Sequence, residues 1–221
     1  MGCDIHGIFQ KRSTTNPGTW EFVEHGYEFG RHYQLFAVLA DVRNGHGFAG
    51  IKTGDCVTPI SEPRGFPDDW TFEDEVTVPD IKFTSPRRQK SVQEHPDWYK
   101  EPDDSPLRVW LGDHSHSWLT STEMLAWYEN APTVEHCGVI SKEEYDAWDG
   151  KTAPDSYCDM ISGPGVVVSD YREPGGFRGS PTHVRVYWQQ GLKEELGYFF
   201  EEIARLHAEH GEVRMVFGFD S

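Results

Sequence analysis

The sequence predicts a single α+β (or α/β) domain in which a mixed β-sheet carries packed helices. Three observations lead to this fold class. Alternating apolar and polar residues near the N-terminus are typical of a β-hairpin, and two Ser/Thr-x-x-Glu patterns in the middle mark helix starts. A strand, an amphipathic helix and a further strand follow one another at the end. With 221 residues, the chain is long enough to bury one large core.

The N-terminal hairpin is predicted from IHGIFQKR (residues 5–12) and TWEFVEHGYEF (residues 19–29). Between them, TTNPGT contains the Asn, Pro and Gly residues that favour a turn. A helix follows in RHYQLFAVLADVRNG, where apolar residues recur at helical spacing and Asn44-Gly45 is typical of a C-cap. The apolar residues of this helix are Leu35, Phe36, Leu39 and Val42.

The region from residue 45 to residue 106 is expected to be mostly loop, because Pro, Gly and charged residues interrupt it throughout. We interpret residues 70–106 as a loop insertion or lid rather than a separate domain, since their apolar content is too low for a core of their own. Within this segment, EVTVPDIKF predicts a short edge strand.

Capping boxes predict the starts of two central helices. Thr120 is expected at the N-cap and Glu123 three residues later, with Leu119 and Met124 forming a hydrophobic staple around this start. The stretch from Ser141 to Glu144 repeats the pattern for a second helix.

Four segments are expected to be strands: LRVWLGDHSHSW at its beginning, VVVSDYR, THVRVYW and EVRMVFGFD. The last two flank LKEELGYFFEEIARLHAEHG, in which apolar residues form one helical stripe ended by Gly211. The stripe consists of Leu192, Leu196, Phe199, Ile203 and Leu206.

Charge and composition restrict the possible partners. The formal net charge of −17 disfavours nonspecific nucleic-acid binding but leaves room for a local site that takes a small anionic ligand. No apolar run is long enough to span a bilayer, and no secretory signal is visible. The four cysteines are scattered without a C-x-x-C pair, which favours reduced thiols and a cytoplasmic location. Composition leaves the oligomeric state open.

Two pairs of residues have the spacing of metal ligands on a strand. Asp4 and His6 form one pair, and His114 and His116 form the other. Residues two apart in an extended strand point to the same face, so each pair would present both side chains together. We expect the four side chains to line one cleft and to hold a divalent metal ion, Zn²⁺ or Mn²⁺. The alternative is that these polar residues only cap strand ends.

An anion site is predicted beside these histidines. The stretch HSHS lies just before the capped helix, whose free N–H groups and dipole favour a phosphate. Ser117 is a candidate contact to this anion, and Arg31, Arg43 and Arg64 are candidates for clamping it. In a chain this acidic, arginines are also common ion-pair partners, and the neighbouring Asp68 and Asp69 could pair with Arg64.

Proton transfer and ligand orientation have candidates in the same segment. His114 and His116 could move protons as well as bind a metal. Asp113 could orient a ligand histidine as an outer-shell carboxylate, or it could cap the end of a strand.

The stretches MGCDIH, RHYQLFAVLADVRN, PRGFPDD, DHSHSWLT and VRMVFGFD resemble an uncharacterised protein family found largely in bacteriophages and prophages. The resemblance covers the two ends and the centre of the chain, and His32 stands where the family pattern has a carboxamide residue. It implies a viral, intracellular context and supports grouping these motifs into one site, without specifying a reaction.

Three hypotheses for function follow. The first is a metal-dependent hydrolase acting on a small phosphorylated or nucleotide substrate, which in a phage could counter host defence. The second is a module that binds and sequesters a nucleotide without turnover or metal. The third is an acidic interaction protein whose surface imitates nucleic acid. The first two require a concave site lined by His and Arg, whereas the third requires rows of surface carboxylates.

Overall fold

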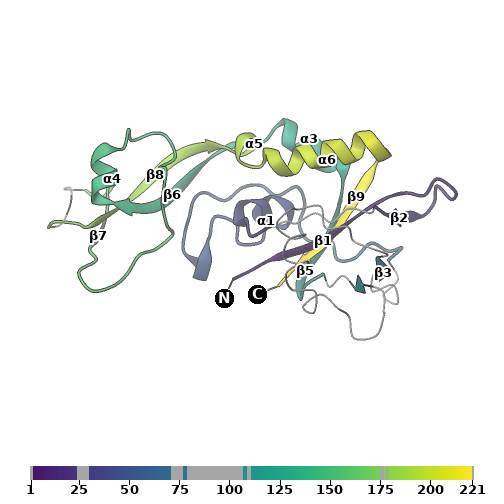
Figure 1. The fold of residues 1–221 in the computed structure, drawn as a ribbon, viewed down its shortest axis with the longest axis horizontal. Helices are drawn as coiled ribbons and strands as arrows, with labels where there is room; N and C mark the ends of the chain where they lie inside the picture. The colour runs from purple at the N-terminus through teal and green to yellow at the C-terminus, as the bar shows by residue number, and fades with distance from the viewer. Residues whose placement is uncertain are drawn as a thin grey trace, which may run out of the picture. The chain divides into compact units, whose positions relative to one another are not determined.

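The computed structural model describes residues 2–23, 30–70, 77–78, 107–108, 111–174, 177 and 179–220, with backbone only for 77–78 and 107–108. The predicted α+β class is confirmed, because these residues form an antiparallel four-stranded sheet, a mixed three-stranded sheet and several helices (Figure 1).

The contacts divide the chain into two compact units, which we describe separately. The β1–β9 unit comprises Cys3–His32, Ile60–Ala126 and Phe200–Ser221. The β6–β8 unit comprises Met1–Gly2, Tyr33–Pro59 and Trp127–Phe199. The single domain expected from the chain length stays a prediction.

The sheet of the β1–β9 unit has the strand order β2-β1-β9-β5, and every neighbouring pair is antiparallel. Its strands are β1 (Ile5–Arg12), β2 (Trp20–Phe22), β5 (His114–Thr120) and β9 (Val213–Phe219). The predicted hairpin is confirmed by the pairing of β1 with β2. The last strand in the sequence therefore lies at the centre of the sheet, between β1 and β5.

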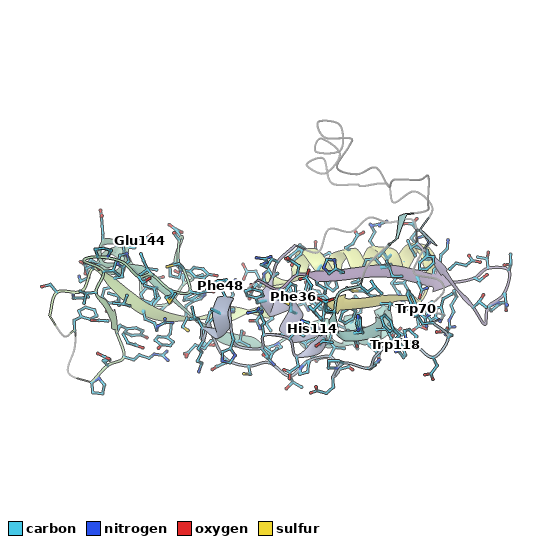
Figure 2. All side chains as sticks on the ribbon, turned by 90° about the horizontal axis from the view of Figure 1, so that it is seen from below. Phe36, Phe48, Trp70, His114, Trp118 and Glu144 are labelled. Carbon is cyan, nitrogen blue, oxygen red and sulfur yellow. The ribbon has the colours of Figure 1, made fainter. Side chains whose placement is uncertain are left out.

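Apolar side chains cover both faces of this sheet, which explains why all seven residues of β9 are buried. On one face, Ile8, Leu111 and Val216 form a cluster. Phe66 and Trp70, from the loop that ends the described range 30–70, pack against this cluster. Figure 2 shows Trp70 and Trp118 on this part of the structure, with His114 nearby. The opposite face buries the residues Phe9, Leu119, Met215, Phe217 and Phe219.

Helix α3 (Ser121–Glu129) begins where the sequence predicts. The Thr120 hydroxyl accepts a hydrogen bond from the Glu123 backbone N–H at 3.3 Å, and Glu123 Oε2 accepts one from the Thr120 N–H at 2.9 Å. These two bonds confirm the capping box. The Ser121 hydroxyl accepts a further bond from Val213 N–H, which ties the helix start to β9.

The β6–β8 unit is built on a sheet with the order β6-β8-β7, in which β6 and β8 are antiparallel and β7 and β8 are parallel. Its strands are β6 (Thr133–Ser141), β7 (Val168–Asp170) and β8 (His183–Gly191). Helix α4 (Lys142–Ala147) starts at Ser141 with the predicted capping box. The unit also contains α1 (Tyr33–Ala40), the 3-10 helix η1 (Phe48–Gly50) and α5 (Leu192–Glu195).

Helix α6 (Gly197–His210) begins in the β6–β8 unit and continues in the β1–β9 unit. The predicted apolar stripe from Leu192 to Leu206 is confirmed, since all five of its side chains are fully buried. Gly211 adopts a φ of 74° directly after the helix, a conformation that glycine tolerates and that ends helices.

One expectation about secondary structure is wrong, and one strand was missed. Helix α1 ends at Ala40 rather than at Asn44-Gly45, because Asp41 takes a left-handed φ of 59° and breaks the helical path. Strand β6 was not expected from the sequence, since Gly138 and several polar residues interrupt its apolar pattern. Its nine residues are paired along their whole length with β8, so tertiary pairing defines this strand.

The expected edge strand within residues 75–83 is present as β3 (Thr77–Val78), which pairs with β4 (Leu107–Arg108) in antiparallel fashion. Most of the predicted insertion or lid, residues 70–106, and the end of the predicted hairpin lie outside the described residues. In the described part of the chain, no helix is long and apolar enough to cross a membrane. None of the four cysteines, all of which the structure describes, forms a disulfide.

Candidate functional site

The strand register of the β1–β9 unit brings the predicted metal ligands to one end of one sheet. In the central strand β9, Gly218 lies opposite His6 of β1, and Phe219 lies opposite both Ile5 of β1 and His114 of β5. Backbone bonds continue this pairing by one step, because Asp220 N–H donates to the Asp4 carbonyl at 3.1 Å. We call this end of the sheet, from Asp4 and His6 across to His116, the strand-end site.

Asp4 is held in a two-bond ion pair. Arg31 donates from Nε to Oδ1 at 2.8 Å and from its terminal nitrogen to Oδ2 at 2.6 Å. The hydrogen bonds from Arg31 hold the pKa of Asp4 below its ordinary value, so the carboxylate is ionised at neutral pH. About half of the Arg31 side chain is exposed, so a bound anion could reach its guanidinium.

His6 is paired with a carboxylate that the sequence analysis did not single out. Its Nε2 lies 3.2 Å from Oδ2 of Asp220, the residue after β9. The other carboxylate oxygen of Asp220 accepts a hydrogen bond from Asp4 N–H at 2.9 Å, which fixes the orientation of the carboxylate. His6 and Asp220 are each roughly 30% exposed, so the pair can be reached from solvent.

The second pair of predicted ligands is split by a bulge. Strand β5 shifts register between His114 and Ser117, and Ser115 adopts a left-handed φ of 51°. The expectation that His114 and His116 point to the same face is therefore wrong. The His114 ring stacks on Phe219, at a centroid distance of 6.1 Å.

His116 instead lies over Gly218, on the face that His6 shares. A Cβ atom at Gly218 would come within 2.6 Å of the His116 ring, so only glycine leaves room for this imidazole. Phe66 covers the ring at 4.4 Å between centroids. His116 Nε2 is 3.1 Å from the Gly112 carbonyl, which can only accept, so Nε2 carries the proton and Nδ1 remains as a lone-pair donor.

His6 and Asp220 have the separation of two ligands of one metal ion. Two ligands bound to one ion at 2.0–2.1 Å with tetrahedral geometry lie about 3.3 Å apart, close to the separation of His6 Nε2 and Asp220 Oδ2. Among the residues that the structure describes, no group of three or more His, Cys, Asp and Glu side chains could hold a metal ion. The strand-end site thus offers two ligands from His6 and Asp220, and further ligands would have to come from water or substrate.

The predicted anion site at the start of α3 is occupied by the protein itself. Extended strand continues from His116 to Thr120, so the His116 backbone lies about 13 Å from the helix start rather than beside it. Burial raises the pKa of Glu123, but hydrogen bonds from Arg64 and Thr120 outweigh this and hold the pKa below its ordinary value. The Glu123 carboxylate therefore already serves as the anion at this helix N-terminus.

Arg64 is committed to structural contacts. Its guanidinium donates to Glu123 Oε1 at 2.7 Å and to Ser61 Oγ at 2.8 Å, rather than pairing with the neighbouring aspartates. Ser117 is fully buried, and its hydroxyl accepts a hydrogen bond from Arg64 N–H at 3.2 Å. These contacts fasten the loop before Phe66 to β5.

The remaining candidates lie apart from these contacts. Asp113 is exposed, and no hydrogen bond joins its carboxylate to another described residue, whereas its backbone N–H donates to the Phe219 carbonyl at 2.7 Å. Arg43 belongs to the β6–β8 unit, where it donates to the Gly47 carbonyl at 3.2 Å and lies 5.1 Å over the Tyr33 ring. The roles proposed for both residues stay predictions.

Sequence reasoning missed Asp220 and Phe66, which both touch the predicted histidines. Asp220 carries a signal in retrospect, because it lies two residues after Gly218 in the closing strand and so shares its face. Phe66 has no such signal, since its contact with His116 arises from loop packing.

Comparison with known proteins gives no match: no protein-family model, no curated protein and no solved structure is significantly similar to this chain.

Proposed function

We propose that the protein is a metal-dependent hydrolase acting on a small phosphorylated substrate such as a nucleotide. The observation that carries this proposal is the pairing of His6 with Asp220 beside the Asp4–Arg31 ion pair, all at one accessible end of a sheet. A metal-ligand pair and a guanidinium side by side suit a phosphate that has one oxygen on an ion and another on an arginine.

His6 Nε2 and Asp220 Oδ2 would hold the ion, which would be Zn²⁺ or Mn²⁺ and would supply a water of lowered pKa. Asp4 N–H orients the Asp220 carboxylate as an outer-shell partner. The His116 ring lies over Gly218, on the face of the sheet that His6 shares, and its Nδ1 is the candidate to accept a proton.

Arg31 is the candidate to bind the substrate phosphate. It is half exposed and already oriented by Asp4, so less conformational freedom would be lost on binding. Arg64 and Ser117, which the sequence analysis placed in the same role, instead support the site by holding the loop that carries Phe66 against His116.

A second candidate function is supported by the small number of ligands. His6 and Asp220 alone would hold an ion weakly. Arg31 and the imidazoles of His6 and His116 could bind a phosphate without any ion. The protein would then sequester a nucleotide rather than hydrolyse it. Both functions fit the context implied by the resemblance, which is action in the cytoplasm of a phage-infected host cell, for example against a nucleotide signal of host defence.

The test is turnover of a nucleotide panel with and without a chelator, using wild type, His6→Ala and Asp220→Asn. We expect each substitution to reduce turnover more than about 100-fold, because even outer-shell partners of metal ligands contribute 10–100-fold. Both variants should melt near wild type, since His6 and Asp220 are partly exposed. His46→Ala is the matched control, because His46 is an exposed histidine of the other unit.

The outcomes separate the hypotheses. Turnover that is lost with the chelator and restored by Zn²⁺ or Mn²⁺ supports the hydrolase. Tight nucleotide binding that survives the chelator, without product from wild type, overturns the hydrolase and supports the sequestering module. Absence of binding by every nucleotide overturns both and leaves the acidic interaction protein.

A further inference from the structure

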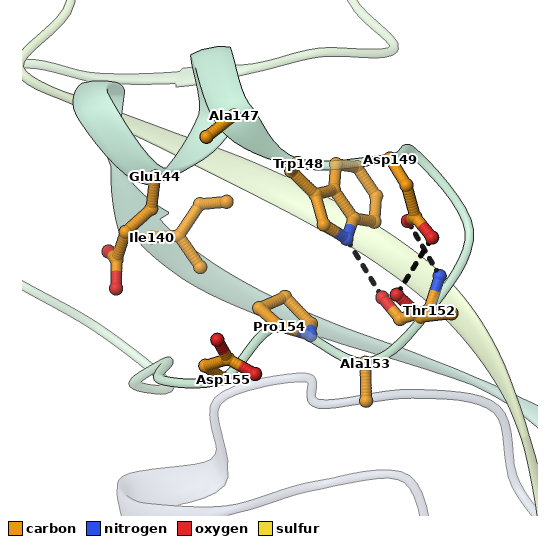
Figure 3. Close-up of a pocket in the computed structure, with 9 residues that line it drawn as sticks. All are labelled: Ile140, Glu144, Ala147, Trp148, Asp149, Thr152, Ala153, Pro154 and Asp155. Carbon is orange, nitrogen blue, oxygen red and sulfur yellow. Dashed lines mark hydrogen bonds between the residues drawn. The ribbon is translucent and has the colours of Figure 1, made fainter.

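A pocket of about 310 Å³ lies in the β6–β8 unit, beside α4 and the loop that follows it (Figure 3). Its apolar lining comes from Ile140 at the end of β6, from Trp148 and from Pro154. The indole of Trp148 is held in place, because its Nε1–H donates to the Thr152 carbonyl at 2.8 Å. The pocket thus has a fixed aromatic wall and an aliphatic floor.

Every charged residue that lines this pocket is acidic, namely Glu144, Asp149 and Asp155. Hydrogen bonds from Ser141 hold the pKa of Glu144 below its ordinary value, and the Thr152 and Lys151 N–H groups do the same for Asp149. Both carboxylates are therefore ionised at neutral pH. No described lining residue is basic, and the basic groups that act on these carboxylates from outside the lining are Lys151 on Asp149 and His183 on Glu144.

The carboxylates differ in how far the fold already uses them. Asp149 accepts from Thr152 N–H, Thr152 Oγ1 and Lys151 N–H, so it is engaged in its own turn. Glu144 accepts from Ser141 N–H through Oε2. Asp155 is exposed and makes no hydrogen bond to another described side chain or backbone group.

Figure 3 shows how the lining residues are distributed along the pocket. Glu144, Ile140 and Asp155 lie toward one end of the pocket, Asp149 and Thr152 lie toward the other, and Pro154 lies between them. A ligand that fits this arrangement has a positive head for the Glu144–Asp155 end and an apolar stem to lie along the floor.

We propose that this pocket binds an organic cation on an aliphatic stem, an alkylguanidinium or alkylammonium group. The cation would lie between Glu144 and Asp155, and its stem would pack on Ile140, Pro154 and Trp148. An anionic or neutral ligand would leave the carboxylates uncompensated, and a bare metal ion would need more oxygen ligands than the apolar walls provide. This inference is independent of the strand-end site.

The experiment is a titration of the ¹⁵N-labelled full chain, followed through the indole N–H resonance of Trp148. Butylguanidinium chloride is the probe, and butanol at the same concentration is the neutral counterpart. We expect a saturable shift with butylguanidinium only, weakened by added salt because charge contributes. Asp155→Asn should weaken this affinity about threefold, as expected for a partly exposed charge pair.

A control variant and a peptide probe decide whether the proposal holds. Asp55→Asn removes another exposed carboxylate of the same unit, outside the pocket, and this variant should bind as wild type does. A capped Gly-Arg-Gly peptide distinguishes the sources: binding of the peptide indicates an arginine of a protein partner, and binding of butylguanidinium alone indicates a free small cation. The proposal is overturned by no saturable shift, by an equal shift with butanol, or by equal weakening in Asp55→Asn and Asp155→Asn.

Discussion

The central strand β9 of the β1–β9 unit is buried along all seven residues, whereas in the β6–β8 unit even the long strand β8 alternates between buried and partly exposed positions. Large apolar side chains that are exposed by more than a third occur, among the described residues, only in the β6–β8 unit. They are Phe48, Tyr157, Met160, Val167, Val168, Tyr171 and Tyr198.

This difference concerns how each unit positions polar groups. In the β1–β9 unit, apolar residues cover both faces of the sheet, and the candidate site residues Asp4, His6 and Asp220 lie at the strand ends, where backbone pairing holds them. In the β6–β8 unit, one face carries the core of Ile140, Val184, Val186 and Trp188, and much of the remaining surface is open. Fixed geometry suits catalysis, and an open, partly apolar surface suits binding.

Alanine substitutions at two strand glycines, Gly218 and Gly138, should reveal the largest difference in stability between the two units. At Gly218, a Cβ would lie 2.1 Å from the Leu111 carbonyl oxygen, a backbone atom that cannot move without disturbing the sheet. We expect Gly218→Ala to lower the free energy of unfolding by about 1–3 kcal/mol. At Gly138, the closest atom, at 2.8 Å, belongs to the ring of Tyr157, a side chain that is half exposed. Gly138→Ala should therefore cost less.

Urea denaturation of both glycine variants measures this difference. Equal losses would show that the two sheets tolerate strain alike and would contradict the comparison. Gly191→Ala serves as the control, because the nearest atom to its added Cβ is Thr133 Oγ1 at 4.0 Å.

The two capping boxes offer a second, smaller comparison. Thr120 starts α3, in which Ser121 and Met124 are buried, whereas Ser141 starts α4, which has no buried residue. Thr120→Ala should lower stability by about 1 kcal/mol, and Ser141→Ala should lower it less, because α4 contributes little to a core. Thermal melts of both variants test this, and a larger loss for Ser141→Ala would run against it.

The smallest expected effect on stability comes from substitutions in two exposed arginine–carboxylate pairs. Arg31 lowers the pKa of Asp4, and Arg172 lowers the pKa of Glu135. A carboxylate with a lowered pKa stabilises the fold above its unfolded pKa and loses this contribution as pH falls through the folded value. Arg31→Met should therefore raise the pKa of Asp4 alone and change stability at pH 7 by less than about 1 kcal/mol.

The measurement is a ¹³C NMR titration of the side-chain carboxyl groups between pH 2 and 7. The Glu135 titration is the internal control and should not move in Arg31→Met. A wild-type titration midpoint for Asp4 in the variant would show that the ion pair does not set its charge.

Local signals predicted much of the fold but only part of the candidate site. The turn between β1 and β2, both capping boxes and the stripe from Leu192 to Leu206 depend on neighbouring residues, and these predictions are confirmed. The bulge at Ser115 and the partner of His6 depend on pairing with β9, a strand that lies about a hundred residues or more away in sequence. Nothing in HSHS itself indicates that its histidines diverge.

The central place of β9 has a consequence for how the protein is made. His6 and Asp220 are separated by 214 residues, and β1 and β5 meet no partner in the middle of their sheet until β9 arrives. Such long-range closure makes folding slow and leaves the edges of early strands exposed during synthesis. On the ribosome, β1 and β5 would wait for almost the whole chain, so the strand-end site would assemble as one of the last steps of folding.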